Sequence, residues 1–218
     1  MNPGTLPTPP SDLAERTLSI LDFDKSIFRS HSIFHHPLFF GKAGLYRFDA
    51  PDGSYKVLYA GADLYCAFIE SLIKNPSNRV VTTAELKAKA VAELKGARSL
   101  RLIDLTPSGA LMRMGADSRL FSGDHEAARV WSKALHDHPI GADGILYPSR
   151  LDPLRQAVVL FSDRVPKIVE LSRQSWYAPG PLRRSLAQIA EHYQVELIEN
   201  HFVAPRRPVG IAAKPGLL

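Results

Sequence analysis

Short apolar stretches recur along the chain. They consist of β-branched, aromatic or aliphatic residues and are bounded by Pro, Gly, Asn or Asp. Such runs are typical of strands. The pattern predicts strands at 45–48, 56–60, 100–105, 144–147 and 157–161, with short extended pieces at 27–31, 34–40, 80–81 and 195–198. A hairpin is expected between the first two, because residues 49–53 (Asp-Ala-Pro-Asp-Gly) are turn formers.

Helix signals fall between these strands. Capping residues followed by an apolar stripe predict helices. The expected helices run from Ser11 or Asp12 to about Phe23, from Asp63 to Lys74, from a capping box at Thr82–Glu85 to about Lys95, from Asp124 to His136, and from Leu182 to Tyr193. Hairpin-like connections between strands favour an α+β fold over a doubly wound parallel sheet.

Composition limits the class of protein. With 218 residues, 45% of them apolar, the chain is long enough for one large domain with a real core. Cys66 is the single cysteine, which excludes an internal disulfide and favours a reducing compartment. We find no secretory signal pattern and no apolar run of about 18–20 residues. We therefore expect a cytoplasmic protein that does not contact membranes.

The chain carries a net charge of +5 and has a pI near 9.4. Its basic residues are spread out, and the densest groups, Arg183-Arg184 and Arg206-Arg207, lack interleaved aromatic residues. An anionic small molecule or an acidic protein partner explains this charge as well as nucleic acid does, so direct nucleic-acid binding is not expected. A non-enzymatic basic binding module remains an alternative.

Common catalytic motifs are missing from the sequence: it has no GxxxxGK, GxGxxG or GxSxG pattern. Histidines cluster at His31, His35 and His36 and again at His136 and His138, but each cluster lies at a proline-containing turn. The spacing alone is weak evidence for zinc. We therefore expect no metal site.

Single polar residues stand within apolar segments at Arg29, Arg47, Glu70 and Ser149. A charged group in apolar surroundings is costly unless it is paired or used. Each residue could face solvent on an amphipathic element, or Arg47 and Glu70 could form a structural ion pair. The alternative is a functional site.

Taken together, these segments resemble the RES domain, which is named for its Arg, Glu and Ser residues. The resemblance extends from about Phe28 to Asp163. It rests on the order of the segments HPLFF (36–40), YRFD (46–49), VLYAG (57–61), AFIE (67–70), LIDL (102–105), SGD (122–124), RVW (129–131), DGILYPSR (143–150) and VVLF (158–161).

The resemblance implies a fold like that of ADP-ribosyltransferases, with a mixed, split β-sheet around an NAD cleft. It divides the chain into a lead and helix (1–25), the RES domain (26–165) and a C-terminal extension (166–218). Many members are toxins of type II toxin–antitoxin systems, with an Xre-type helix-turn-helix antitoxin as partner. The resemblance is therefore compatible with a homo-oligomer and with a toxin–antitoxin hetero-oligomer. Their activities include NAD hydrolysis, NAD phosphorolysis and ADP-ribosylation of a protein.

By position, the resemblance puts Arg47, Glu70 and Ser149 in the catalytic set and adds Arg29 and Tyr59 to the NAD pocket. The chemistry is consistent with these residue types. Guanidinium groups of Arg29 and Arg47 suit a pyrophosphate, and the ring of Tyr59 suits a cationic nicotinamide. A carboxylate, Glu70, stabilises positive charge on the ribose as the glycosidic bond stretches. Nicotinamide leaves as a neutral molecule, so Ser149 is expected to contact substrate rather than act as a nucleophile. NAD is thus the expected substrate.

Overall fold

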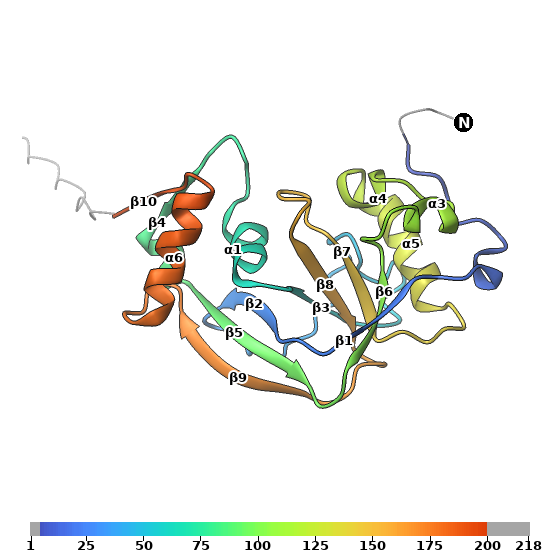
Figure 1. The fold of residues 1–218 in the computed structure, drawn as a ribbon, viewed down its shortest axis with the longest axis horizontal. Helices are drawn as coiled ribbons and strands as arrows, with labels where there is room; N and C mark the ends of the chain where they lie inside the picture. The colour runs from blue at the N-terminus through green and yellow to red at the C-terminus, as the bar shows by residue number, and fades with distance from the viewer. Residues whose placement is uncertain (1–4, 200–218) are drawn as a thin grey trace, which may run out of the picture.

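The computed structural model describes residues 5–199 and contains one large sheet, a small sheet and surrounding helices (Figure 1). The large sheet has the strand order β1-β6-β7-β8-β3-β2-β5-β9, and β10 pairs with β4 in the small one. The strands are β1 (Ile20–Phe23), β2 (Ile27–Ser32), β3 (Val57–Gly61), β4 (Val80–Thr82), β5 (Lys89–Gly96), β6 (Leu100–Asp104), β7 (Gly144–Pro148), β8 (Gln156–Phe161), β9 (Ile168–Ser175) and β10 (Glu196–Ile198). The helices are η1 (Leu13–Glu15), α1 (Leu64–Leu72), α2 (Thr83–Lys87), α3 (Ala110–Met114), α4 (Arg119–Ser122), α5 (His125–His136) and α6 (Pro181–His192).

The large sheet is mixed and almost divided. Within it, only β6 and β7 run parallel, and every other neighbouring pair is antiparallel. β2 meets β3 through a single residue pair, Phe28 with Gly61. The predicted α+β class with a mixed, split sheet is therefore confirmed.

Helix α1 covers this division and packs against β2, β3 and β8. Gly61 allows the close approach: a Cβ there would lie 2.5 Å from the backbone nitrogen of Ala67. Asp63 caps the helix, because its Oδ1 accepts a hydrogen bond of 2.8 Å from the Cys66 nitrogen. The cap and the close contact fix the position of α1, and hence of Glu70, relative to the sheet.

Several elements match their predictions. The Asp63 and Asp124 caps, the capping box at Thr82 and Glu85, and the buried strands β7 and β8 are present. Helix α6 and strand β10 also lie where they were expected. Cys66 is fully buried in the core.

Four expectations are wrong, one of which is the extended piece at 34–40, a segment that contains turns and no strand. Residues 11–23 form η1 and strand β1 rather than one helix, because residues 20–23 pair with β6. The helix from Thr82 stops at Lys87, and β5 follows, held between β2 and β9. Residues 45–48 are a turn and not a hairpin strand, because the Asp49 carboxylate takes the backbone N–H groups of Leu45 and Tyr46. Strand β9 and helices α3 and α4 were not predicted.

The C-terminal residues are joined to the rest of the described chain. Strand β9 pairs with β5 over most of its length. Trp176, just after β9, is fully buried against Phe68 of α1, with ring centroids 5.5 Å apart. The family-based division of the chain at residue 165 stays a prediction.

Candidate active site

Glu70 and Ser149 meet across the space between α1 and the loop that joins β7 to β8. The buried face of α1 points toward the sheet and α6, which leaves Glu70 exposed on the side facing this loop. Ser149 Oγ donates a 2.5 Å hydrogen bond to Glu70 Oε1 and accepts from the backbone nitrogens of Leu151 (3.2 Å) and Asp152 (3.4 Å). The hydroxyl is therefore fully engaged and only 1% of the residue is exposed. This geometry suits an orienting role for Ser149.

Arg47 lies on the turn between Leu45 and Asp49. Its Nη1 donates to the carbonyl oxygens of Leu120 (3.2 Å) and Gly123 (2.9 Å), which fixes the guanidinium at the end of α4. Burial is the largest cause that lowers the pKa of Arg47, and the nearby charge of Arg150 lowers it further. Glu70 contributes an opposing electrostatic interaction, but its side chain bonds Ser149 and that of Arg47 bonds two carbonyl oxygens, with no salt bridge between them. The structural ion pair considered from the sequence is thus absent between these two described residues.

Asp49 holds the turn that carries Arg47. Its Oδ2 accepts from the nitrogens of Leu45 (3.0 Å) and Tyr46 (3.1 Å), and its Oδ1 accepts from the Tyr59 hydroxyl (3.0 Å). The residue is only 2% exposed. The sequence pattern did not indicate a role for Asp49, although its position two residues after Arg47 was a usable signal.

Two tyrosines, Tyr59 on β3 and Tyr147 on β7, lie near these charged groups. The Tyr59 hydroxyl also accepts from the Phe48 nitrogen (2.9 Å), and its ring lies 5.8 Å from that of Tyr46 in an edge arrangement. Burial raises the pKa of both tyrosines well above the usual value, and for Tyr147 the nearby Glu70 charge adds to this effect. Tyr147 was missed as a site residue; its place at the end of β7, two residues before Ser149, was the available signal.

The structure does not bring Arg29 to this group. Residues paired across neighbouring strands share a sheet face, and successive residues alternate faces. Phe28 pairs with Gly61, so both share the face of Tyr59, whereas Arg29 pairs with Ala92 on the opposite face. Burial lowers the pKa of Arg29 to about 10, and its Nη1 is buried without a hydrogen-bond partner in residues 5–199.

A cavity of about 570 Å³ adjoins Ser149, within the size range of small-molecule sites. The β7–β8 loop forms one wall and the segment from β6 to α4 forms the other. Its lining residues are Leu105, Thr106, Pro107, Gly109, Leu111, Met112, Ala116, Asp117, Ser118, Phe121, Ser122, Pro148, Ser149, Arg150 and Pro153.

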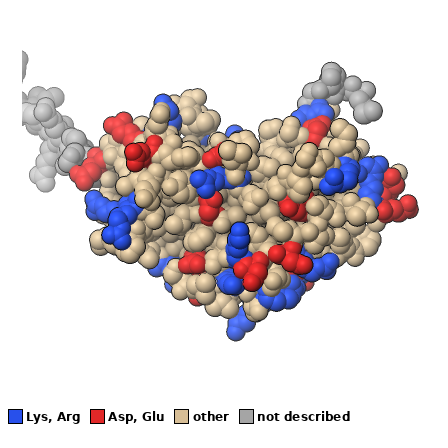
Figure 2. Space-filling view, viewed as in Figure 1, with Lys and Arg blue, Asp and Glu red and all other residues tan. Residues whose placement is uncertain are grey.

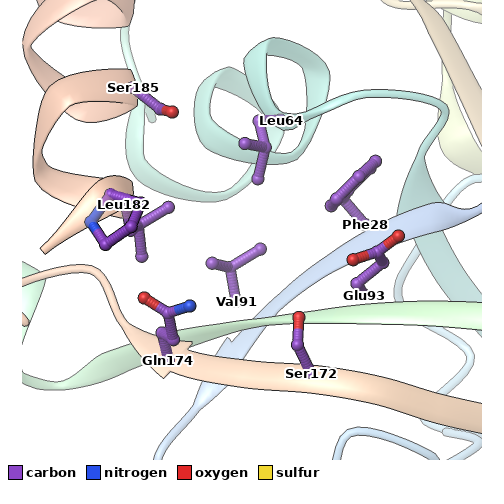
Figure 3. Close-up of a pocket in the computed structure, with 9 residues that line it drawn as sticks. Phe28, Leu64, Val91, Glu93, Ser172, Gln174, Leu182 and Ser185 are labelled. Atoms are coloured by element: carbon purple, nitrogen blue, oxygen red, sulfur yellow. The ribbon is translucent and has the colours of Figure 1, made fainter.

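A second cavity, of about 190 Å³, lies between α1, α6 and strands β2, β5 and β9 (Figure 3). Phe28, Leu64, Val91 and Leu182 give it apolar walls, and Glu93 points toward it. It contains none of the five predicted site residues. The cavity beside Ser149 is therefore the better candidate for the active site.

Other observations bear on metal, membrane and nucleic-acid binding. Within residues 5–199 no three His, Cys, Asp or Glu side chains are grouped to hold a metal ion, and no helix of that part is long and apolar enough to cross a bilayer. His136 forms hydrogen bonds with Asp137 and Asp163, and His138 forms hydrogen bonds with the carbonyl oxygens of Leu13 and Arg16.

Lys and Arg are interspersed with Asp and Glu on the face shown in Figure 2. That distribution differs from the continuous basic stripe typical of nucleic-acid binding.

Comparison with known proteins identifies relatives. The model of the RES domain family matches residues 25–185. A protein of Sinorhizobium fredii (strain NBRC 101917 / NGR234) named "Probable toxin y4kH" is 34% identical over 119 residues, which cover 53% of this chain and 87% of the relative.

Among solved structures, a chain in the crystal structure of the M. tuberculosis MbcT-MbcA toxin–antitoxin complex superposes with a TM-score of 0.56. The match covers 75% of this chain and 93% of that chain, at 14% sequence identity, so it shows similarity of fold. The family match spans well over half of the sequence and includes Arg47, Glu70 and Ser149. The chain belongs to the RES domain family.

Proposed function

We propose that the protein is the toxin of a type II toxin–antitoxin pair and that it degrades NAD by cleaving the nicotinamide–ribose bond. The observation that carries the proposal is the Glu70 carboxylate, which is held by Ser149, a lining residue of the cavity, and lies near Arg47 and Tyr147. A relative named as a probable toxin and the fold shared with a chain of a toxin–antitoxin complex support the toxin role.

Glu70 supplies the electrostatic part of the reaction. As the C–N bond breaks, its electron pair moves to the pyridinium nitrogen and nicotinamide leaves neutral, so positive charge remains on the ribose. Ser149 fixes Oε1, and no hydrogen bond in residues 5–199 engages Oε2, which is left to face that charge. A carboxylate about 4 Å away contributes on the order of 4 kcal/mol at an effective dielectric constant near 20, roughly three decades in rate.

Arg47 and Tyr59 hold the substrate in this proposal. Arg47 Nη1 bonds two carbonyl oxygens, which leaves Nε and Nη2 to donate to a pyrophosphate oxygen. The Tyr59 hydroxyl is fixed by Asp49 and Phe48, so its ring is held rigidly for stacking on nicotinamide. Water or phosphate then bonds through an oxygen to the ribose carbon, and an attacking water releases one proton to the solvent. The products are ADP-ribose or its 1-phosphate.

The test incubates the purified full chain with NAD, with and without phosphate, and separates the products by chromatography. Release of nicotinamide with ADP-ribose supports hydrolysis, and strict dependence on phosphate supports phosphorolysis. Attachment of ADP-ribose to an added lysate protein, without free ADP-ribose, would favour the alternative of a protein ADP-ribosyltransferase. Intact NAD together with salt-sensitive DNA retention would instead support a non-enzymatic basic module.

The proposed partner is an Xre-type helix-turn-helix antitoxin. Expression of the chain alone in bacteria is expected to lower cellular NAD and stop growth. Co-expression with the cognate antitoxin is expected to restore both, and co-purification would give the stoichiometry. Growth arrest with unchanged NAD would reject the proposed activity while leaving the toxin role in place.

A further inference from the structure

Arg47 and Arg150 both lie beside the cavity next to Ser149. Arg150 lines it, and Arg47 donates to the carbonyl oxygens of Leu120 and Gly123, which flank the lining residues 121 and 122. Arg47 lies on the turn before β3, and Arg150 lies on the β7–β8 loop directly after Ser149. Their charges interact, and the interaction is unfavourable for both protonated guanidinium groups. Two like charges placed together are stabilised when an anion lies between or beside them.

Neither arginine forms a direct ion pair with a carboxylate in residues 5–199, although the charge of Glu70 also acts on Arg47. Arg47 donates to two carbonyl oxygens, and the exposed Arg150 has no hydrogen bond or ion pair among residues 5–199. Arg155, on the same loop, differs: it donates to Asp63 at 2.9 Å and lies over the Tyr65 ring. Arg155 is thus a structural arginine, whereas Arg150 is available.

Arg150 also lines the cavity of about 570 Å³ beside Ser149. Asp117 is the carboxylate among the lining residues, and Arg119 pairs with it at 2.5 Å. The lining also includes Leu111, Met112 and Phe121. The cavity therefore combines an unbalanced cation with apolar walls, which suits an anion attached to a flat organic group.

We propose that Arg150 is a second anion-binding residue and that, together with Arg47, it holds the diphosphate of a dinucleotide substrate. The two guanidinium groups match the two negative charges of a diphosphate, and each can donate to phosphate oxygens. Arg150 replaces Arg29, which lies on the other sheet face, as the second arginine of the site. The inference rests on the proposed NAD cleavage.

The kinetic test compares nicotinamide release by the wild type, Arg150→Ala and Arg150→Lys. Loss of a charge-assisted contact is expected to raise KM for NAD about 10- to 100-fold and to leave kcat within about twofold. Lysine is expected to restore part of the affinity, and KM of the alanine variant is expected to depend less on salt. Arg184→Ala is the matched control, because Arg184 is exposed on α6, far along the chain from the site.

Calorimetric titration with ADP-ribose separates this inference from the proposed function. Wild-type binding that weakens about 10- to 100-fold in Arg150→Ala, and not in Arg184→Ala, supports the role of Arg150 even if NAD is not cleaved. Equal ADP-ribose affinity and equal KM in the wild type and Arg150→Ala would overturn it. A fall in kcat with unchanged KM and unchanged ADP-ribose affinity would overturn it as well.

Discussion

The Ser149 hydroxyl donates a 2.5 Å hydrogen bond to Oε1 of Glu70 and so connects the β7–β8 loop to helix α1. Residues 79 positions apart in the sequence thus act as one unit. One oxygen of the carboxylate is held by this bond, and the serine proton is committed to it. In the proposed reaction, this bond lets Glu70 and Ser149, the second and third residues of the family name, serve a single electrostatic role.

Replacing Ser149 by alanine is expected to lower the rate of nicotinamide release by roughly 10- to 100-fold, because Glu70 loses a charge-assisted hydrogen bond. The residual activity should stay well above background, as Glu70 keeps its charge. Steady-state kinetics of Ser149→Ala, with the exposed Ser77→Ala as control, measures this. Complete loss of activity in a folded variant would instead indicate that Ser149 takes part in bond formation.

Asp49→Ala is expected to destabilise the fold and to weaken NAD binding together. The change leaves the Leu45 and Tyr46 nitrogens and the Tyr59 hydroxyl without their acceptor. A buried donor left unpaired costs about 1–3 kcal/mol, and the amides of the exposed residues Leu45 and Tyr46 add less than the Tyr59 hydroxyl, so a loss of about 3 kcal/mol is expected in urea unfolding. KM for NAD should rise because the turn that carries Arg47 loosens. The exposed Asp52→Ala is the control, and equal stability of the two variants would contradict the role of Asp49.

Trp176→Ala is expected to reduce the free energy of unfolding by about 3–5 kcal/mol, the usual cost of removing a large buried aromatic side chain. The indole is fully buried against Phe68, and its Nε1 donates to Ser30 Oγ at 2.9 Å. The partly exposed neighbour, in Tyr177→Ala, should cost less than about 1 kcal/mol. Equal midpoints for the two variants would show that the segment after β9 contributes little to the core.

Stability is expected to fall as the pH falls from 7 through 6.5, in part because of His31. Burial, and to a lesser degree the charges of Arg29 and Arg173, lower the pKa of His31 below 6.5 in the folded state. The Nε2 atom is buried without a partner among the described residues, so a proton there finds no acceptor. The unfolded chain binds this proton first, and protonation therefore favours unfolding in the window below 6.5.

Urea unfolding at several pH values measures this effect in His31→Gln. In His31→Gln, the free energy of unfolding should change less steeply with pH, by an amount that corresponds to the uptake of up to one proton on unfolding. His35→Gln, at an exposed position, should show the same pH dependence as the wild type. A wild-type slope retained in His31→Gln would assign the pH dependence to other groups.

Local signals in the sequence predicted the elements whose ends are set by neighbouring residues. Asp63, Asp124 and the Thr82–Glu85 box each form their bonds within a few residues, so the helix starts were predicted correctly. The end of the helix after Thr82 was not, because β5 is fixed by pairing with strands far away in the sequence. Strand β1 was not predicted for the same reason, because it is fixed by pairing with β6, far away in the sequence.

In the candidate site, too, some residues could be predicted from the sequence and others depend on the fold. Sequence resemblance indicated Glu70 and Ser149, and the structure joins them directly. It did not indicate Asp49, whose role depends on the turn and Tyr59, nor that Arg29 faces away, which depends on strand register. The sequence did not indicate Arg150 either, because its place in the lining of the cavity depends on the fold of the β7–β8 loop.

In the proposed reaction, the negative charge of Glu70 drives cleavage of NAD. In Glu70→Gln the amide oxygen can still accept from Ser149, so the change removes the charge and preserves the shape of the site. The decisive measurement is the rate of nicotinamide release by this variant, with Glu126→Gln, an exposed position on α5, as control. We expect the rate to fall about 1,000-fold in Glu70→Gln, with ADP-ribose affinity retained, and to stay unchanged in the control. A Glu70→Gln rate within tenfold of the wild type would contradict the account.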